Sequence, residues 1–213
     1  MKAARALSVC ILSAAAAILA GAPQAQNAPK GPDITKLDPG LYAVFETSMG
    51  SITAALFEKE VPNATLNFIA LANGRREWKD PKTRKMVARP LYRDLTFHRV
   101  IPFFMIQSGD PTGVGNHDCG FFIPDEIKPD LKFDRPGRLA MASLDQPNTA
   151  SCQFFITEVE QPRLDGKYTI FGQVVDGQEV VGKIARVVTD SKDKPRIDIK
   201  LNTVAILRIV PKQ

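Results

Sequence analysis

Short apolar segments, each followed by a loop rich in Gly, Pro, Asp and Asn, recur along the sequence from residue 41 to residue 210. Short apolar runs bounded by turn residues are typical of β-strands. Many strands with few helices favour a closed or strongly curved antiparallel sheet, with helices over its open ends. The segments are residues 41–47, 51–57, 95–101, 104–107, 139–142, 154–157, 169–175 and 204–210.

Two stretches of the sequence have helical spacing instead. The first begins at Pro62 and ends before Gly74, which is the usual placement of these two residues at helix ends. It is predicted to carry Leu66 and Ile69 on related faces. The second stretch, residues 178–187, repeats Val and Ile at helical intervals.

The chain of 213 residues contains no internal repeat, so one folded domain is the simplest prediction. We place this domain at residues 40–213. Residues 26–39 contain three Pro and no apolar cluster, and are predicted to form a flexible lead-in. Residues 75–90 are strongly charged and contain two Pro, so they are predicted to form a long, solvated surface loop.

Residues 1–25 have the layout of a secretory signal peptide. Lys2 and Arg5 precede an apolar stretch, residues 6–20, which is shorter than the ~20 residues of a typical membrane span. Small residues follow this stretch. The alternative is an uncleaved N-terminal anchor. We therefore predict an exported protein with no stable membrane insertion after cleavage, periplasmic if the source is a Gram-negative bacterium and otherwise secreted.

Signal cleavage would leave two cysteines, Cys119 and Cys152, in a protein outside the reducing cytosol. Such an environment permits a disulfide. Two separate thiols are the alternative, and the sequence leaves both open.

The composition argues against several classes of protein. A net charge of +5, from 28 Lys and Arg against 23 Asp and Glu, is too mild for a dedicated nucleic-acid binder. His98 and His117 have no partners at metal-binding spacing, so neither a metal nor a cofactor is predicted. His98 also lies inside an apolar run, where a structural imidazole is commoner than a hydrolytic base.

One guanidinium lies within the apolar run of residues 97–107. Phe104 and Met105 are bulky enough to form the wall of an apolar pocket beside Arg99, and Gln107 adds a polar group. The alternative interpretation makes Arg99 an exposed strand residue and the aromatic residues part of the core.

Three blocks of sequence resemble the signature of the cyclophilin family. They read FHRVIPFFMIQSGDPTG (97–113), LAMAS followed by PNTASCQFFI (139–156), and LDGKYTIFGQV (164–174). The resemblance covers residues 41–211 in family order, and residues 78–90 look like an insertion seen in exported bacterial members. It implies a mainly β fold: a closed eight-stranded antiparallel barrel capped by two helices.

The resemblance also implies roles for individual residues. Arg99 matches the catalytic arginine of the family. The substrate-binding positions are matched by His98, Phe104, Met105, Gln107, Ala142, Ser143, Gln153, Phe155, Leu164 and Tyr168. Phe103 and Ser108 replace glycines of the signature. Arg163 stands where cyclosporin-sensitive members have Trp, so weak cyclosporin binding is predicted.

The implied activity is peptidyl-prolyl cis-trans isomerisation in exported polypeptides, which assists their folding. Rotation about an X-Pro bond breaks the amide conjugation, and Arg99 would then stabilise the prolyl nitrogen in the twisted state. The expected partners are proline-containing unfolded or partly folded chains. We expect a monomer without nucleic acid. A binding or chaperone module without turnover is the main alternative.

Overall fold

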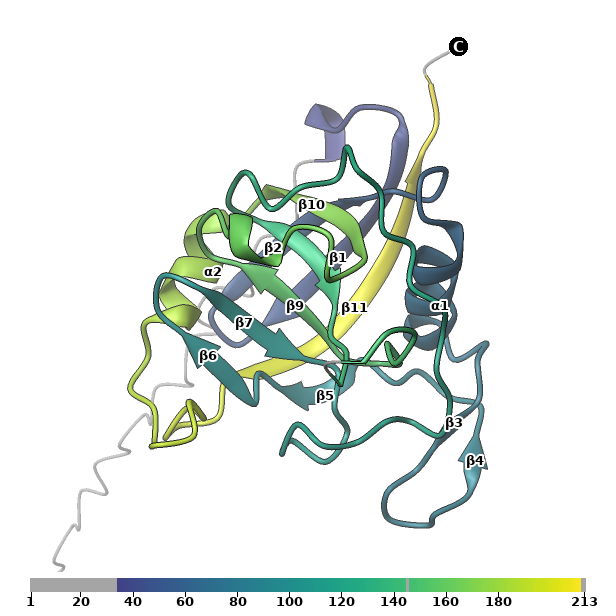
Figure 1. Cartoon of the computed structure of the whole chain (residues 1–213), viewed down its shortest axis with the longest axis vertical. Helices are drawn as coiled ribbons and strands as arrows, with labels where there is room; N and C mark the ends of the chain where they lie inside the picture. Colours follow the sequence, from purple (N-terminus) through teal and green to yellow (C-terminus); the bar gives the residue numbers. More distant parts are fainter. Residues whose placement is uncertain (1–33, 145, 212–213) are drawn as a thin grey trace, which may run out of the picture.

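The structure is a computed structural model that describes residues 34–144 and 146–211 (Figure 1). The predicted signal peptide and most of the predicted lead-in lie outside the described residues; the described part of the lead-in forms a short 3-10 turn, η1 (Ile34–Lys36). Within the described ranges, no helix has the length and apolar character needed to cross a membrane.

Nine strands form one curled antiparallel sheet in the order β5-β11-β1-β2-β10-β8-β9-β7-β6. The segments predicted from apolar runs all contribute to it, and the predicted hairpin of β1 and β2 is confirmed. The strands are β1 (Gly40–Thr47), β2 (Gly50–Leu56), β5 (Arg93–Thr96), β6 (Arg99–Ile101), β7 (Met105–Ser108), β8 (Arg138–Met141), β9 (Phe154–Thr157), β10 (Ile170–Asp176) and β11 (Lys200–Ile209).

The expectation of a closed eight-stranded barrel is wrong in two respects. The predicted strand of residues 95–101 is divided into β5 and β6, which gives nine strands. These two strands end the sheet, β5 on β11 and β6 on β7, and do not pair with each other. The backbone between them bonds instead to the segment before β11: Phe97 N–H donates to Ile199 O, and Val100 N–H to Asp193 O. The covalent chain therefore links the two ends of the curled sheet, where a closed barrel would have a ladder of hydrogen bonds.

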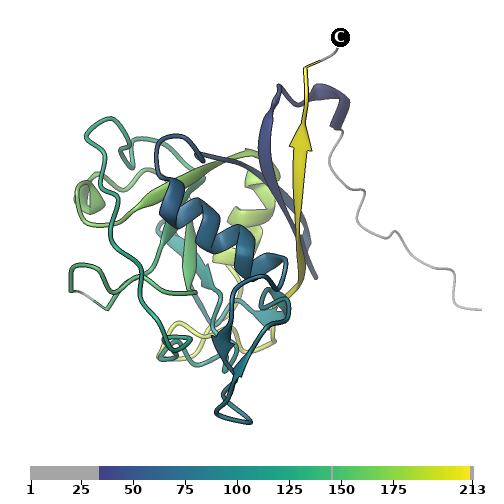
Figure 2. The same ribbon diagram turned by 90° about the vertical axis from the view of Figure 1, so that its right-hand side faces the viewer.

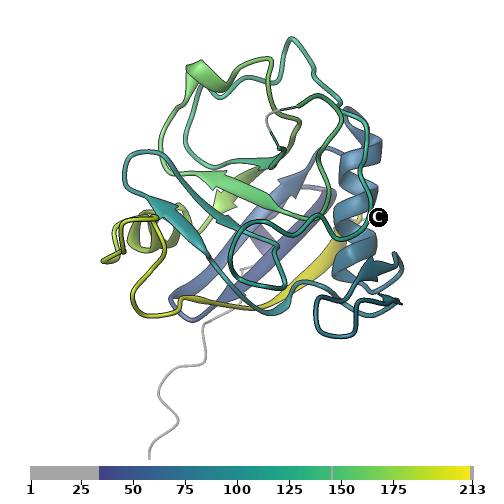
Figure 3. The ribbon, with the colours of Figure 1, turned by 60° about the horizontal axis from the view of Figure 1, so that its bottom comes forward.

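Two helices, α1 (Pro62–Ala72) and α2 (Gln178–Ala185), lie on opposite sides of the curled sheet (Figures 1 and 3). Both helices were predicted from the helical spacing of the sequence, and both predictions are confirmed. The predicted face of α1 is wrong, because Leu66 is 61% exposed and the helix buries Phe68 and Leu71 instead. Glu126 caps the start of α1, accepting the Ala64 N–H at 2.8 Å, where a carboxylate also opposes the positive end of the helix dipole.

Residues 75–90 are more ordered than the predicted surface loop. They contain a small two-stranded hairpin, β3 (Trp78–Lys79) and β4 (Met86–Val87), which projects beside α1 (Figure 2). Trp78 is only 2% exposed, and its indole N–H donates to Arg89 O at 2.9 Å. The buried indole holds the hairpin against the domain, while its basic residues remain at the surface. Composition shows the charge of this segment but cannot reveal that its one Trp has a place in the core.

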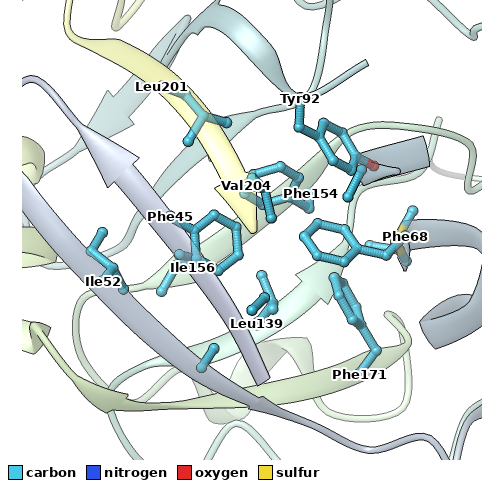
Figure 4. Close-up of a cluster of buried hydrophobic side chains, with 14 of the residues drawn as sticks. Phe45, Ile52, Phe68, Tyr92, Leu139, Phe154, Ile156, Phe171, Leu201 and Val204 are labelled. Atoms are coloured by element: carbon cyan, nitrogen blue, oxygen red, sulfur yellow. The ribbon is translucent and has the colours of Figure 1, made fainter. Parts of the chain in front are cut away.

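The core inside the curled sheet is mainly aromatic and aliphatic (Figure 4). Phe68 of α1 lies at its centre, with its ring centroid 4.9–5.8 Å from those of Phe45, Tyr92, Phe154 and Phe171. Alternation along each strand sends one set of side chains to this core and the other set to the outer face. In β9, Phe154 and Ile156 face the core, whereas Phe155 belongs to a second, smaller cluster on the outer face.

A disulfide joins Cys119 to Cys152, at a sequence separation of 33. Cys119 lies in the loop that follows β7, and Cys152 lies two residues before the start of β9. The bond thus ties a long loop to the strand that carries Phe155.

Loss of this disulfide is expected to lower the free energy of unfolding by about 3–4 kcal/mol, because the unfolded chain would regain the freedom of a closed loop of this length. Urea unfolding of residues 26–213, which lack Cys10, with and without dithiothreitol measures the change. The Cys119→Ser/Cys152→Ser variant should have the same free energy of unfolding as the reduced protein, and dithiothreitol should not change it. Two free thiols in the denatured, unreduced mature protein would contradict the bond.

Candidate active site

A row of side chains crosses the outer face of the sheet through directly paired residues. Arg99 of β6 pairs with Gln107 of β7, Gln107 pairs with Phe155 of β9, and Phe155 pairs with Ala140 of β8. Because paired residues in an antiparallel sheet project to the same face, this register alone brings the guanidinium, the amide and the aromatic ring together. Ile101 and Met105 form the next pair along β6 and β7.

A cavity of about 170 Å³ opens over this row. A buried cavity of about 150 Å³ accepts benzene, so the space suffices for a five-membered ring. Every residue predicted to bind substrate contributes to its lining except His98 and Gln153. The lining residues are Arg99, Phe104, Met105, Gln107, Ala142, Ser143, Phe155, Leu164 and Tyr168.

Aromatic packing gives the cavity a rigid apolar wall. Phe155 stacks on the fully buried Phe133 at 5.9 Å between ring centroids, and Tyr168 meets the Phe155 ring edge-on at 5.4 Å. Leu164 reaches the wall from the 3-10 turn η2 (Pro162–Leu164). This turn also places the Arg163 guanidinium 4.6 Å from the centre of the Phe104 ring. The predicted weak binding of cyclosporin at Arg163 stays a prediction.

Arg99 lies at the edge of the cavity with its side chain 45% exposed. Its Nε is 3.5 Å from Asp193 Oδ2, and the backbone of Asp193 accepts the N–H of Val100 at 2.9 Å. An exposed ion pair of this kind adds little stability. It does hold one side of the guanidinium, while other N–H groups of the same side chain remain available toward the cavity.

A network of amides bounds the polar side of the site. Gln107 Nε2 donates to Gln153 Oε1 at 2.9 Å, and Gln153 Nε2 donates to Gly115 O and His117 O at 3.2 and 3.1 Å. Gln153 lines a smaller cavity of about 50 Å³ that adjoins the first through the shared residues Gln107, Ala142 and Ser143.

His98 lines neither cavity. The ring is 5% exposed, and neither of its nitrogens has a hydrogen-bond partner among the described residues. Burial therefore lowers the pKa of His98 below its usual 6.5, although the carboxylate of Asp110 acts in the opposite direction. His98 is thus buried, whereas the side chain of the next residue, Arg99, is 45% exposed at the edge of the cavity.

The stability of the protein should fall as the pH drops below about 6.5, because the unfolded state then binds a proton that the buried His98 does not. Well above pH 6.5, His98 is neutral in both states and stability is not reduced. Between pH 6.5 and the lower pKa of the folded state, the free energy of unfolding decreases as the pH falls. Its slope is at most about 1.4 kcal/mol per pH unit. Urea unfolding of the wild type and of His98→Gln at pH 7.5, 6.5 and 5.5 measures this. Equal pH dependence in the two proteins would contradict the prediction.

Among residues 34–144 and 146–211, no group of three or more His, Cys, Asp or Glu side chains is arranged to hold a metal ion. The polar side chains that line the larger cavity are the Arg99 guanidinium, the Gln107 amide and the hydroxyl groups of Ser143 and Tyr168.

Sequence reasoning missed several residues beside the site. Phe122 and Leu144, both about half exposed, line the smaller cavity, and Asp193 pairs with Arg99. Phe122 lies in an irregular loop without a periodic pattern, and Asp193 lies in a charged turn far along the chain from Arg99. The local sequence around Phe122 or Asp193 does not indicate a contact with the site, since only the packing of these loops against the sheet brings them there.

Comparison with known families decides what kind of protein has this arrangement. The family model described as "Cyclophilin type peptidyl-prolyl cis-trans isomerase/CLD" matches residues 42–206, which is most of the chain. The chain belongs to the cyclophilin family. Its class is therefore that of the peptidyl-prolyl cis-trans isomerases, and proline-containing peptides are the substrates of this class.

Cyclophilin relatives match along nearly their whole length. The chain is 42% identical to the probable peptidyl-prolyl cis-trans isomerase A of Mycobacterium leprae over 166 residues, which cover 77% of this chain and 91% of the relative. It is 41% identical to peptidyl-prolyl cis-trans isomerase B of Streptomyces anulatus over 169 residues, 78% and 96% of the two chains.

A solved structure shares the fold. The crystal structure of a Cryptosporidium parvum cyclophilin type peptidyl-prolyl cis-trans isomerase in the presence of the dipeptide Ala-Pro superposes with a TM-score of 0.68 at 35% identity. The match covers 79% of this chain and 99% of that chain.

Proposed function

We propose that this cyclophilin accelerates rotation about X-Pro bonds by holding the proline ring in the larger cavity and stabilising the twisted amide with Arg99. The observation that carries the proposal is the row Arg99–Gln107–Phe155, which sets a guanidinium beside an apolar wall. Phe104, Met105, Phe155 and Leu164 would enclose the ring, and Gln107 and Ser143 would hold the acyl side.

The guanidinium suits this reaction for an electronic reason. In the planar amide the nitrogen lone pair is delocalised, whereas in the twisted transition state it returns to the nitrogen. A donor aimed at that nitrogen therefore binds the transition state more strongly than either ground state, which is the condition for catalysis. Guanidinium keeps its protons at any physiological pH, so the donor is always present.

The magnitude required is within reach of these groups. Uncatalysed isomerisation at ~0.01 per second raised to an ordinary turnover of ~10–1000 per second is a factor of ~10³–10⁵, or ~4–7 kcal/mol. One charge-assisted hydrogen bond and the orientation of the ring supply energies of this order. The reaction transfers no group, so no nucleophile is needed.

A protease-coupled assay on a peptide of the Ala-Pro-Phe type tests the activity, because the protease cleaves only the trans isomer. The wild-type protein should abolish most of the slow phase at substoichiometric concentration. A protein that binds the peptide but leaves the slow phase unchanged would instead be a binding module on the same fold. Similarity to the Cryptosporidium parvum protein, solved with Ala-Pro, supports a site for proline dipeptides.

We also propose that the protein acts outside the cytosol, as a monomer, on unfolded or partly folded chains. The location is supported by the signal-like layout of residues 1–25, together with the disulfide between Cys119 and Cys152. Mass spectrometry of the protein from the extracytoplasmic fraction of a producing cell tests export. An intact N-terminus on protein found only in the cytosol would reject it.

A further inference from the structure

The turn between β6 and β7 contains a residue in an unusual conformation. Phe104 N–H donates to Ile101 O at 3.2 Å, which closes a four-residue turn with Pro102 second and Phe103 third. Phe103 has a φ of 58°, in the left-handed region that favours glycine, and its side chain is 69% exposed. Phe103 is therefore in a conformation that costs free energy and that its own exposed ring does little to offset.

Two buried side chains hold this turn by its backbone. Glu158 lies directly after β9, and its Oε2 accepts a hydrogen bond from the Phe103 N–H at 2.5 Å. Gln161 donates from Nε2 to Phe103 O at 2.8 Å. The backbone N–H of Glu158 also donates to Phe104 O at 2.8 Å. Both peptide groups around Phe103 are thus tied to the segment that runs from β9 to the pocket residue Leu164.

Helix α2 completes the arrangement from the other side. Arg186, which ends the helix, lies 2.6 Å from Glu158 Oε1, and its guanidinium carbon is 5.3 Å from the centre of the Phe103 ring. Gly182 leaves room for this pair, since a Cβ there would come within 2.9 Å of Arg186 Nη1. The Glu158 side chain is 3% exposed, and its charge is compensated by the half-exposed Arg186 and by the Phe103 N–H.

We propose that Glu158 is a positioning residue of the active site. By fixing Phe103 in the left-handed conformation, its carboxylate sets the geometry between Arg99, two residues before the turn, and Phe104 and Met105, at the end of the turn and directly after it. The guanidinium and the pocket wall lie on opposite arms of this one hairpin. A relaxed turn would let the arms shift, and small displacements of catalytic groups are costly to the rate. The inference rests on the proposed function for the identity of the active site.

A double-mutant cycle with Phe103→Gly tests the proposal, because glycine adopts a positive φ without a clamp. Glu158→Ala is expected to lower kcat/KM about tenfold, mainly through kcat, with KM within about twofold of the wild type. In the Phe103→Gly background the same change should alter kcat/KM by less than about twofold. Glu160→Ala, at an exposed position two residues further on, is the matched control and should leave activity unchanged.

Circular dichroism and thermal unfolding establish that each variant is folded at the assay temperature. If Glu158→Ala does not fold, Glu158→Gln replaces it, since this side chain keeps an acceptor for the Phe103 N–H but loses the ion pair; the expected loss is then about threefold. Wild-type kcat/KM in a folded Glu158 variant, or an equal loss in both backgrounds, would overturn the proposal. Arg99→Ala is assayed in parallel: full activity there would reject the proposed mechanism, whereas an inactive Arg99→Ala beside an unaffected Glu158→Ala would reject only this inference.

Discussion

Replacement of Arg99 by Ala is expected to lower kcat/KM for an Ala-Pro peptide about 10²–10³-fold, while the peptide still binds. Loss of a single preorganised donor to a transition state has an effect of this size, about 3–4 kcal/mol. The cavity wall of Phe104, Met105, Phe155 and Leu164 remains in the variant, so most of the ground-state binding should remain. The protease-coupled assay gives the rate, and peptide titration followed by NMR gives the affinity.

Two further variants make this result specific. Arg99→Lys retains the charge but not the planar set of donors, and is expected to be intermediate between wild type and Arg99→Ala. Arg93→Ala removes an exposed arginine from β5, which precedes β6 in the sequence but lies away from the cavity, and should retain full activity. Undiminished turnover in Arg99→Ala would show that the pocket works by orientation alone.

Replacement of Phe68 by Ala is expected to lower the free energy of unfolding by about 3–5 kcal/mol, the usual cost of removing a buried phenylalanine ring. Phe68 is fully buried and contacts four other aromatic rings. Three of these rings belong to β1, β9 and β10, and the fourth belongs to the residue directly before β5. For a domain of this size the thermal midpoint should fall by roughly 10 °C.

The matched control for this variant is Leu66→Ala, two residues earlier on the same helix. Leu66 is mostly exposed, so its truncation should change the free energy of unfolding by less than about 0.5 kcal/mol. Urea unfolding of both variants provides the comparison. A larger loss for Leu66→Ala than for Phe68→Ala would mean that α1 packs through the face predicted from its sequence and not through the face described above.

The placement of the site could be predicted from the sequence where local alternation and register suffice. Arg99, Met105 and Gln107 fall on one face because each strand alternates and the turn between β6 and β7 is short. Family resemblance then supplied Phe155 and Leu164, which no periodicity connects to Arg99. Their roles in binding and catalysis remain predictions that the proposed variants test.

What could not be predicted depends on contacts between distant segments. The break at residues 97–98, which divides one apparent strand into β5 and β6, follows from bonds to residues 193 and 199 and not from any local signal. The face of α1 was misjudged because Leu66 and Phe68 are both apolar, and helical spacing alone does not say which of them meets the aromatic core. The contact of Glu158 with the Phe103 turn likewise could not be predicted, because it involves Arg186, a residue directly after α2 and far from Glu158 in the sequence.

The pairing of β1 with β11 has a consequence for how the chain is made. Gly40 aligns with Ile209, so the earliest strand to be synthesised has one neighbour that is synthesised last. Until β11 is in place, β1 keeps only β2 as a neighbour and β5 has no partner strand, and an unpaired strand edge is prone to wrong pairing. Completion of the sheet therefore depends on β11, the last described strand to be synthesised, which supplies a neighbour to both β1 and β5.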